Sequence, residues 1–117
     1  MKLVTAIVQP GCLDELIDAL VAAGVRGLTV TDVHGFGRQY GQYAGQRTAA
    51  GLPAQRSVAL LSKVRLELAV HDDEAESVVE EIAKCAGSGT IGDGKIWVSP
   101  LDTVLRVRTG ERDDAAT

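Results

Sequence analysis

The stretch Leu3-Val-Thr-Ala-Ile-Val8 decides the fold, because it is apolar at nearly every position and stops at Pro10 and Gly11. Such a run is typical of a strand that is covered on both faces, and a Pro-Gly pair ends a strand. Leucine, isoleucine and valine then recur at helical spacing from Leu13 to Val21, and Gly24 supplies a helix stop. The chain is therefore predicted to open with a strand followed by a helix.

The rest of the chain repeats this order. It contains further predicted strands over Leu28 to Phe36, Val64 to Val70, Ile96 to Val98 and Thr103 to Thr109, and a second predicted helix with an apolar stripe from Ala75 to Ala86. His71-Asp-Asp73 is expected to cap this helix and Gly87 to end it. Two similar β-α-β halves predict an α+β fold of the ferredoxin-like kind, with both helices on one side of an antiparallel sheet.

The length and composition predict a single domain that spans residues 1–117. The formal net charge is −4, the longest block of like charge is the acidic Asp72-Asp-Glu74, and no basic block occurs, so nucleic acid is not an expected partner. The sequence lacks a long apolar stretch and a signal-peptide pattern, so we expect a soluble, cytoplasmic chain that does not insert into membranes. Cys12 and Cys85 fit neither a disulfide framework nor a metal clip and are expected to be free, packed thiols.

The face of the sheet that carries no helices is expected to need a cover. The strand from Leu3 to Val8 is apolar on both faces, and only one of them meets the helices. Exposed apolar surface of this kind favours association with further copies, and closed cyclic symmetry is the common solution. We therefore expect a homo-oligomer.

Two segments concentrate glycines near predicted strands. The first, Gly35-Phe-Gly-Arg-Gln39, leads into a long polar loop from Gly37 to about Gln55. Its Gly-x-Gly resembles part of a dinucleotide fingerprint, but Tyr40 takes the place of the third glycine and no helix follows. A binding loop and a flexible turn both remain open for this segment.

The second glycine-rich segment runs from Gly87 to Gly94 and is followed by Lys95. It is not a Walker A motif, because Ile96 stands where a Mg-binding Ser or Thr is needed and the segment leads from a helix into a strand. Closely spaced glycines whose amides turn inward, followed by a lysine, can still form a nest for an anion. The alternative is a plain connector with a solvated lysine.

Arg106 and Arg108 lie two residues apart on a predicted strand, so their guanidinium groups are expected to leave the same face. Such a pair suits phosphate oxygens, although a salt bridge to Glu67 or Asp102 explains it equally well. Taken together, the two glycine-rich segments, Lys95 and the two arginines indicate a site for a polyphosphate.

The sequence lacks the features of an enzyme. His34 and His71 do not have the spacing of zinc ligands, and no serine lies in a nucleophile motif. An acylphosphatase-like hydrolase, which shares this fold, needs an asparagine, and the chain contains none. We expect a binding protein and not an enzyme.

The same residues resemble the PII signal-transduction family over almost the whole chain. The resemblance rests on Met1-Lys-Leu-Val-Thr-Ala-Ile-Val8, Gly27-Leu-Thr-Val-Thr31, Gly35-Phe-Gly-Arg-Gln39, Gly89-Thr-Ile-Gly-Asp-Gly-Lys-Ile-Trp-Val-Ser-Pro100 and Arg106-Val-Arg-Thr-Gly-Glu111. It implies a ferredoxin-like homotrimer that binds ATP or ADP in clefts between subunits. It further implies a T-loop over about 37–58, a B-loop over about 87–95 and a C-terminal tail over 110–117, the last expected to be polar and mobile.

The resemblance also implies which residues bind ligands. Those for the nucleotide are Thr29, Gly35, Phe36, Gly37, Arg38, Gln39, Gly89, Ile91, Gly92, Asp93, Gly94, Lys95, Arg106 and Arg108, the two arginines coming from the neighbouring subunit. In members that bind 2-oxoglutarate, the residue matching Gln39 ligates a Mg²⁺ shared by ATP and the oxo-acid, and the residue matching Lys63 pairs with a carboxylate. The implied metabolite-binding residues are Gly37, Gln39, Gly41, Lys63 and Gly92.

The chain departs from the family pattern at three places. The T-loop reads Tyr40-Gly-Gln-Tyr-Ala-Gly-Gln-Arg-Thr-Ala-Ala-Gly-Leu-Pro53, which is longer than in the family and has no match to the tyrosine that is modified in other members. Gln9 replaces a common lysine beside the ligand pocket, and Thr90 stands where many members carry a lysine. Less positive charge is expected to weaken the binding of dianionic 2-oxoglutarate.

These features predict a signal-transduction protein of nitrogen and carbon metabolism. It is expected to sense ATP or ADP together with 2-oxoglutarate and to regulate a transporter or metabolic enzyme through its T-loop. A PII-like sensor of adenine nucleotide and bicarbonate, acting in inorganic-carbon uptake or fixation, is the alternative that the altered T-loop leaves open. In either case the ligand must bind one state of the loop better than another.

Overall fold

The computed structural model describes residues 1–37 and 60–117. Its regular elements are β1 (Lys2–Val8), α1 (Leu13–Ala22), β2 (Thr29–Gly35), β3 (Leu61–Val70), α2 (Ala75–Ala86) and β4 (Gly94–Pro100), joined in part by the short 3₁₀ turns η1 (Pro10–Cys12), η3 (Asp72–Glu74) and η4 (Asp113–Ala116). The first predicted helix ends at Ala22, two residues before Gly24, which adopts a φ of +94°. The predicted order of two β-α-β halves is therefore confirmed.

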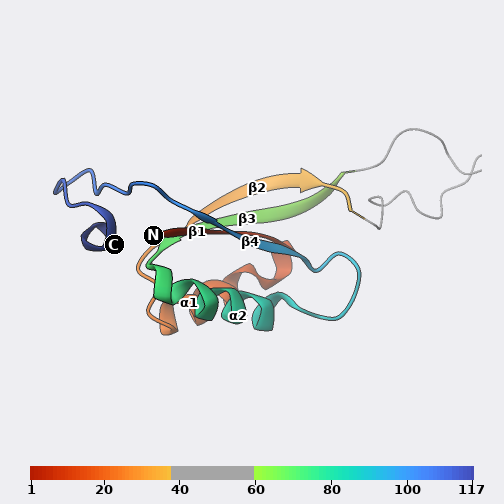
Figure 1. The fold of residues 1–117 in the computed structure, drawn as a ribbon. Helices are drawn as coiled ribbons and strands as arrows, with labels where there is room; N and C mark the ends of the chain where they lie inside the picture. Colours follow the sequence, from red (N-terminus) through yellow and green to blue (C-terminus); the bar gives the residue numbers. More distant parts are fainter. Residues whose placement is uncertain (38–59) are drawn as a thin grey trace, which may run out of the picture.

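The four strands form one antiparallel sheet in the order β2-β3-β1-β4. Both helices lie on one face of this sheet (Figure 1). In the register, Val8 at the end of β1 pairs with Val64 near the start of β3 and with Gly94 at the start of β4. This is the ferredoxin-like α+β arrangement that the sequence predicts.

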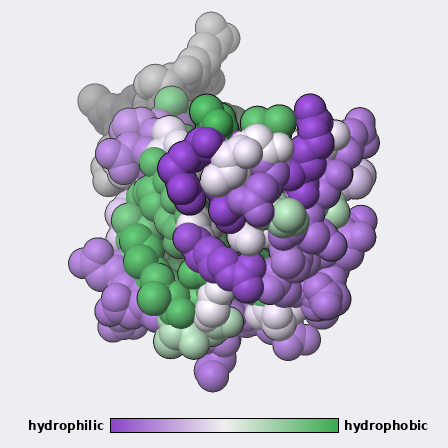
Figure 2. Space-filling model, turned by 90° about the vertical axis from the view of Figure 1, so that its left-hand side faces the viewer, coloured by the Kyte–Doolittle hydropathy of each residue, from purple (hydrophilic) through white to green (hydrophobic). Residues whose placement is uncertain are grey.

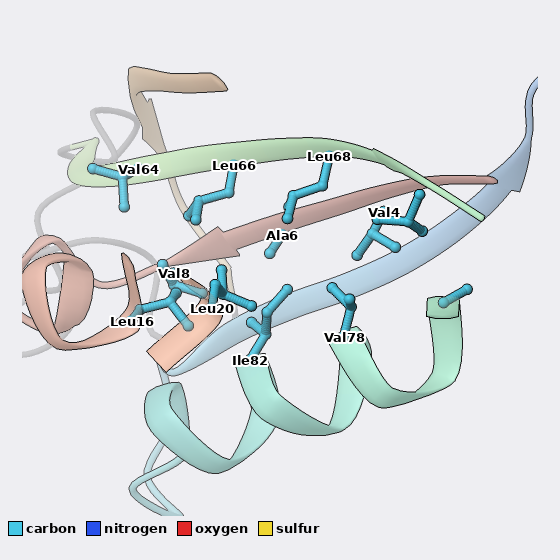
Figure 3. Packing of buried hydrophobic residues seen from close by; sticks show 12 residues of the cluster. Val4, Ala6, Val8, Leu16, Leu20, Val64, Leu66, Leu68, Val78 and Ile82 are labelled. Atoms are coloured by element: carbon cyan, nitrogen blue, oxygen red, sulfur yellow. The ribbon is translucent and has the colours of Figure 1, made fainter. Parts of the chain in front are cut away.

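The core lies between the sheet and the two helices. Alternate residues of a strand point to one face, and Val4, Ala6 and Val8 of β1 are all buried on the helix side. They face the helices as Figure 3 shows, which brings Leu16 of α1 and Ile82 of α2 against the strands. Burying one such aliphatic side chain contributes roughly 1.5–3 kcal/mol to folding, so this layer holds the helices on the sheet.

Helix α2 begins where the sequence predicts, through one additional 3₁₀ turn. The backbone N–H of His71 donates a hydrogen bond to the Glu74 carboxylate at 3.2 Å. Asp72 in the same turn pairs with the amino group of Met1 at 2.8 Å. The hydrogen bond and the charge of that amino group lower the pKa of the Asp72 carboxyl. The start of α2 is thus tied to the start of β1.

The helix-free face of the sheet is mixed in character, which differs from the expectation of an apolar face. β1 contributes the half-buried Leu3 and Ile7 there, as expected. Its cross-strand neighbour β3 contributes Arg65 and Glu67, which form an ion pair with an N–O distance of 3.1 Å. The pattern of β1 alone does not include these charges, so the face combines apolar and charged groups.

The predicted strand from Thr103 to Thr109 is wrong. The described chain has only an isolated bridge between Leu105 and Arg112 in this region, and the residues between them form a turn. The N–H of Gly110 donates to the Arg106 carbonyl at 2.8 Å, and Gly110 has a φ of +73° that glycine adopts without strain. Because the chain reverses here, Arg106 and Arg108 do not share a strand face.

The segment after this turn folds back onto the domain instead of extending as a mobile tail. The Thr117 hydroxyl lies 2.8 Å from the imidazole Nε2 of His71, and an Arg26 guanidinium nitrogen donates to the Thr117 carbonyl at 3.2 Å. In Figure 1 this end of the chain lies beside the start of β1. No helix within residues 1–37 and 60–117 is long and apolar enough to cross a membrane.

Candidate functional site

Three of the predicted site residues lie outside the described part of the chain. They are Arg38, Gln39 and Gly41. The other predicted residues fall into two groups, one at each end of the sheet. The first group contains Gly35 at the end of β2 with the following Phe36 and Gly37, the glycine-rich loop before β4, and Lys63 on β3.

The first group is assembled by the register of the sheet. Gly35 at the end of β2 pairs with Leu61 at the start of β3, and Val8 pairs with both Val64 and Gly94. The end of β2 and the loop before β4 therefore lie at the same end of the sheet, opposite the chain termini (Figure 1). Both glycine-rich segments of the sequence therefore lead from or into this end of the sheet, at its two opposite edges.

Gly94 is required by the geometry of the loop. Its φ is +111°, and a Cβ at this position would overlap the carbonyl oxygen of Ile7 on β1. The backbone of the loop thus approaches the end of β1 more closely than any other residue type would allow. This close approach places the loop in contact with the C-terminal end of β1.

Lys63 on β3 binds the glycine-rich loop through a hydrogen bond to its backbone. Its side chain is 8% exposed, and its ammonium group donates a hydrogen bond of 2.7 Å to the carbonyl oxygen of Gly92. The side-chain amide of Gln9 donates to the same carbonyl at 2.8 Å. Among the described residues Lys63 forms no ion pair, so a buried positive charge faces the loop with only neutral partners. Such a charge favours an added anion.

Asp93 organises the start of the loop. Its Oδ2 accepts hydrogen bonds from the backbone N–H groups of Ser88 at 2.6 Å and Gly89 at 2.8 Å, and its Oδ1 accepts one from the Ser88 hydroxyl. The Ser88 hydroxyl contributes most, and the amides add to it, in lowering the pKa of the Asp93 carboxyl. Two backbone amides at the start of the loop, those of Ser88 and Gly89, therefore converge on a side chain of the loop itself.

The second group lies at the other end of the sheet. Thr29 and Arg106 line one cavity of about 620 Å³, together with Glu67, Arg26 and the last two residues of the chain. Figure 2 views the molecule from this end and shows a band of hydrophobic surface beside hydrophilic residues. The structure thus brings Thr29 and Arg106 together, although 76 residues separate them in sequence.

Arg106 is engaged by its own C-terminal segment. Its Nε donates to the carbonyl of Ala116 at 3.2 Å, and a terminal nitrogen pairs with the Glu111 carboxylate at 3.1 Å. Neither of the alternative partners expected from sequence, Glu67 and Asp102, forms this ion pair. Arg108 lies in the exposed turn after Val107, so the guanidinium groups of the two arginines do not project side by side from one strand face.

The two groups cannot close on one small ligand within one copy. Thr29 lies on β2 at one edge of the sheet and Gly94 on β4 at the other edge. Three strand spacings of about 4.8 Å separate these edges by roughly 14 Å. Arg106 lies farther still, beyond the far end of β4. A site that uses both groups needs a second copy of the chain.

Several contacts of the site carry no sequence signal. Gln9, Ser88 and Glu111 were not predicted as site residues, yet each hydrogen-bonds a predicted one. Only the departure of Gln9 from the family pattern pointed toward it. In the described ranges the structure contains no cluster of three or more His, Cys, Asp or Glu side chains that could hold a metal ion.

Comparison with known proteins gives consistent matches over the chain. The family model described as "Nitrogen regulatory protein P-II" matches residues 1–111. Over 116 residues, which cover 99% of each chain, the sequence is 47% identical to nitrogen regulatory protein GlnK of Escherichia coli. With the same coverage it is 45% identical to nitrogen regulatory protein P-II of Synechocystis sp. and of Nostoc punctiforme.

Proposed function

The chain belongs to the nitrogen regulatory protein P-II family, and on this premise we propose that it binds ATP or ADP between copies of itself. Its role is regulatory, as the family is. The proposal extends this role to a homotrimer in which the bound nucleotide, together with 2-oxoglutarate, sets the state of the T-loop. The T-loop would then act on a transporter or metabolic enzyme in the cytoplasm.

One observation carries the proposal: the predicted phosphate-binding groups lie at opposite ends of one protomer. Gly94 and Lys95 begin β4, whereas Arg106 follows its far end and lines a cavity with Thr29. In a ring of identical copies related by rotation, the end of one chain that carries Gly94 and Lys95 lies against the end of the next chain that carries Arg106. Each interface of such a ring then holds a complete polyphosphate site.

The proposed chemistry of the nucleotide site is recognition of phosphate without a reaction. Backbone amides of the loop from Gly92 to Gly94, the ammonium group of Lys95 and the guanidinium groups of Arg106 and Arg108 supply donors and positive charge. Magnesium held with ATP would be ligated through Gln39. Binding of ATP and ADP then differs in the charge that these groups must balance.

Lys63 is the proposed anchor for the carboxylate of the oxo-acid. It is buried, it has only neutral partners among the described residues, and it lies directly under Gly92. A dicarboxylate such as 2-oxoglutarate would supply the missing negative charge at this point. Gln9 lies beside it with a neutral amide, so we expect weaker binding than a second cation would give.

The test is calorimetric titration of the purified protein with ATP and with ADP, each with and without Mg²⁺ and 2-oxoglutarate. We expect 2-oxoglutarate to bind only in the presence of Mg-ATP. A parallel titration with bicarbonate replaces the oxo-acid, and coupling of bicarbonate alone to the nucleotide would assign the protein to carbon supply. Absence of nucleotide binding under all conditions would overturn the proposal.

A further inference from the structure

The loop between α2 and β4 contains its own anion. The Asp93 carboxylate accepts two backbone N–H groups, from Ser88 and Gly89, and the Ser88 hydroxyl. The Thr90 hydroxyl lies 2.7 Å from the Ser88 hydroxyl and 3.5 Å from Asp93 Oδ1. The donors at the start of the loop are therefore directed at a side chain of the loop and not at solvent.

We propose that Asp93 is a specificity-determining residue, which reserves the first half of the loop for itself and makes the site prefer Mg-bound over free triphosphate. This inference rests on the proposed function, because it concerns the nucleotide that the same loop binds. Phosphate binding then falls to the second half of the loop, from Gly92 to Lys95, as in the proposed function.

The contacts of Asp93 reduce the number of backbone N–H groups that can bind a phosphate. An amide that already donates to a carboxylate at 2.6–2.8 Å has no proton left for a phosphate oxygen. Phosphate bound at the loop must therefore use the N–H groups from Gly92 onward and the Lys95 ammonium. A nest without an internal carboxylate would offer all of its amides to the ligand.

The Asp93 carboxylate also places a negative charge in the loop. The hydrogen bonds to Asp93 lower the pKa of its carboxyl, so the group is ionised at neutral pH. Asp93 is joined directly to Gly92 and Gly94, whose amides are proposed to bind the phosphates, so its charge is close enough to repel them. At short range each full charge on the ligand changes affinity by about tenfold through such repulsion. Mg²⁺ cancels two charges of the triphosphate and so reduces the penalty.

The experiment compares the affinity for ATP with Mg²⁺ and with EDTA in the wild-type protein and in Asp93→Asn. The asparagine keeps the size of the side chain and removes its charge. We expect the ratio of the two affinities, which favours Mg-ATP in the wild type, to fall by about 100-fold in the variant, which is about tenfold for each of the two charges that Mg²⁺ cancels. Asp93→Glu, which retains the charge, is expected to keep the wild-type ratio even where both affinities fall.

The matched control is Ser88→Ala, which removes a hydroxyl donor to Asp93 and leaves the charge in place. It is expected to change both affinities by the same factor. Amide hydrogen exchange at Gly89 should accelerate in Asp93→Asn, which reports loss of the contact itself.

Two outcomes overturn the inference and are distinguishable. Equal changes for ATP with and without Mg²⁺ in Asp93→Asn would show that the carboxylate only shapes the loop, while the proposed nucleotide binding would stand. No nucleotide binding by the wild-type protein would overturn both the inference and the proposed function.

Discussion

At the scale of single residues, Gly94 and Lys63, which both lie beside the glycine-rich loop, are restricted to their residue types for different reasons. Gly94 is constrained by space and backbone conformation, since its φ is +111° and the Ile7 carbonyl occupies the place of a Cβ. Lys63 is constrained by charge, since it is buried and its described partner is a neutral carbonyl. The first constraint concerns folding and the second concerns ligand binding, so they are separable by experiment.

Substitution of Gly94→Ala is expected to lower the free energy of unfolding by about 3 kcal/mol or more, because the Cβ collides with backbone and the φ is strained. Urea denaturation at fixed protein concentration measures this loss. Gly27→Ala is the control, since a Cβ there meets no atom within 4 Å. Equal stability of the two variants would contradict the described position of the loop.

Substitution of Lys63→Met is expected to weaken 2-oxoglutarate binding in the presence of Mg-ATP by about 100-fold, because a charged hydrogen bond contributes roughly 1.5–3 kcal/mol. ATP binding alone should change much less, since Gln9 still holds the Gly92 carbonyl. Calorimetry measures both affinities. Lys84→Met in the last turn of α2 serves as the control, and loss of oxo-acid binding there would argue against a specific role for Lys63.

At the scale of elements, the start of α2 depends on an ionic contact with the start of β1. Asp72 pairs with the amino group of Met1, and the Met1 side chain is buried although the Asp72 side chain is exposed. The turn η3 and the hydrogen bond from His71 to Glu74 place Asp72 next to β1. The contact therefore joins the second β-α-β half to the first.

The lowered pKa of Asp72 gives this contact a defined pH dependence. A carboxyl with a depressed native pKa adds stability above its unfolded pKa near 3.9, and this stability is lost as the pH falls through the native pKa. Asp72→Asn should therefore lower the Tm at pH 7 and have little effect near pH 2. Thermal unfolding of both proteins across this range measures the difference. Asp73→Asn is the control, and an equal Tm loss there would point to general charge effects at the helix start.

At the scale of the whole molecule, the two halves of the proposed nucleotide site lie too far apart to meet in one chain. β4 alone separates Gly94 from Pro100, which is roughly 20 Å at about 3.3 Å per residue. In the proposed site the arginine end then comes from a neighbouring copy. Assembly and binding would then be coupled, since a ligand held between copies stabilises their association.

A mixing experiment tests this arrangement. Lys95→Ala and Arg106→Ala proteins are each expected to bind ATP weakly, because each variant disables one end of every site. When the two are unfolded together and refolded as mixed rings, about a quarter of the interfaces join two intact ends. Calorimetry should then detect tight binding at about that fraction of sites. Recovery of none would show that both residues act within one chain or that the proposed site is wrong.

Much of the fold follows from local pattern. The apolar run ending at Val8, the helical stripe from Leu13 and the glycine at Gly24 specify their elements through neighbours in sequence. Local pattern gives the wrong structure for the segment from Thr103 to Thr109. Its threonines and valines favour a strand, but the chain reverses at Gly110 and Arg106 forms an ion pair with Glu111. A β-propensity is outweighed where no partner strand lies beside the segment.

The sequence by itself determined the order of the elements, the layer of helices on one face and the family, because periodicity and glycine placement are local properties of the chain. Only the tertiary structure decided which polar groups meet: that Lys63 and Gln9 share the Gly92 carbonyl, and that Asp93 closes on Ser88. It also decided that Arg106 lies with Thr29 and away from the glycine-rich loop. These contacts depend on strand register and on the path of turns, which distant residues set together and no single segment encodes.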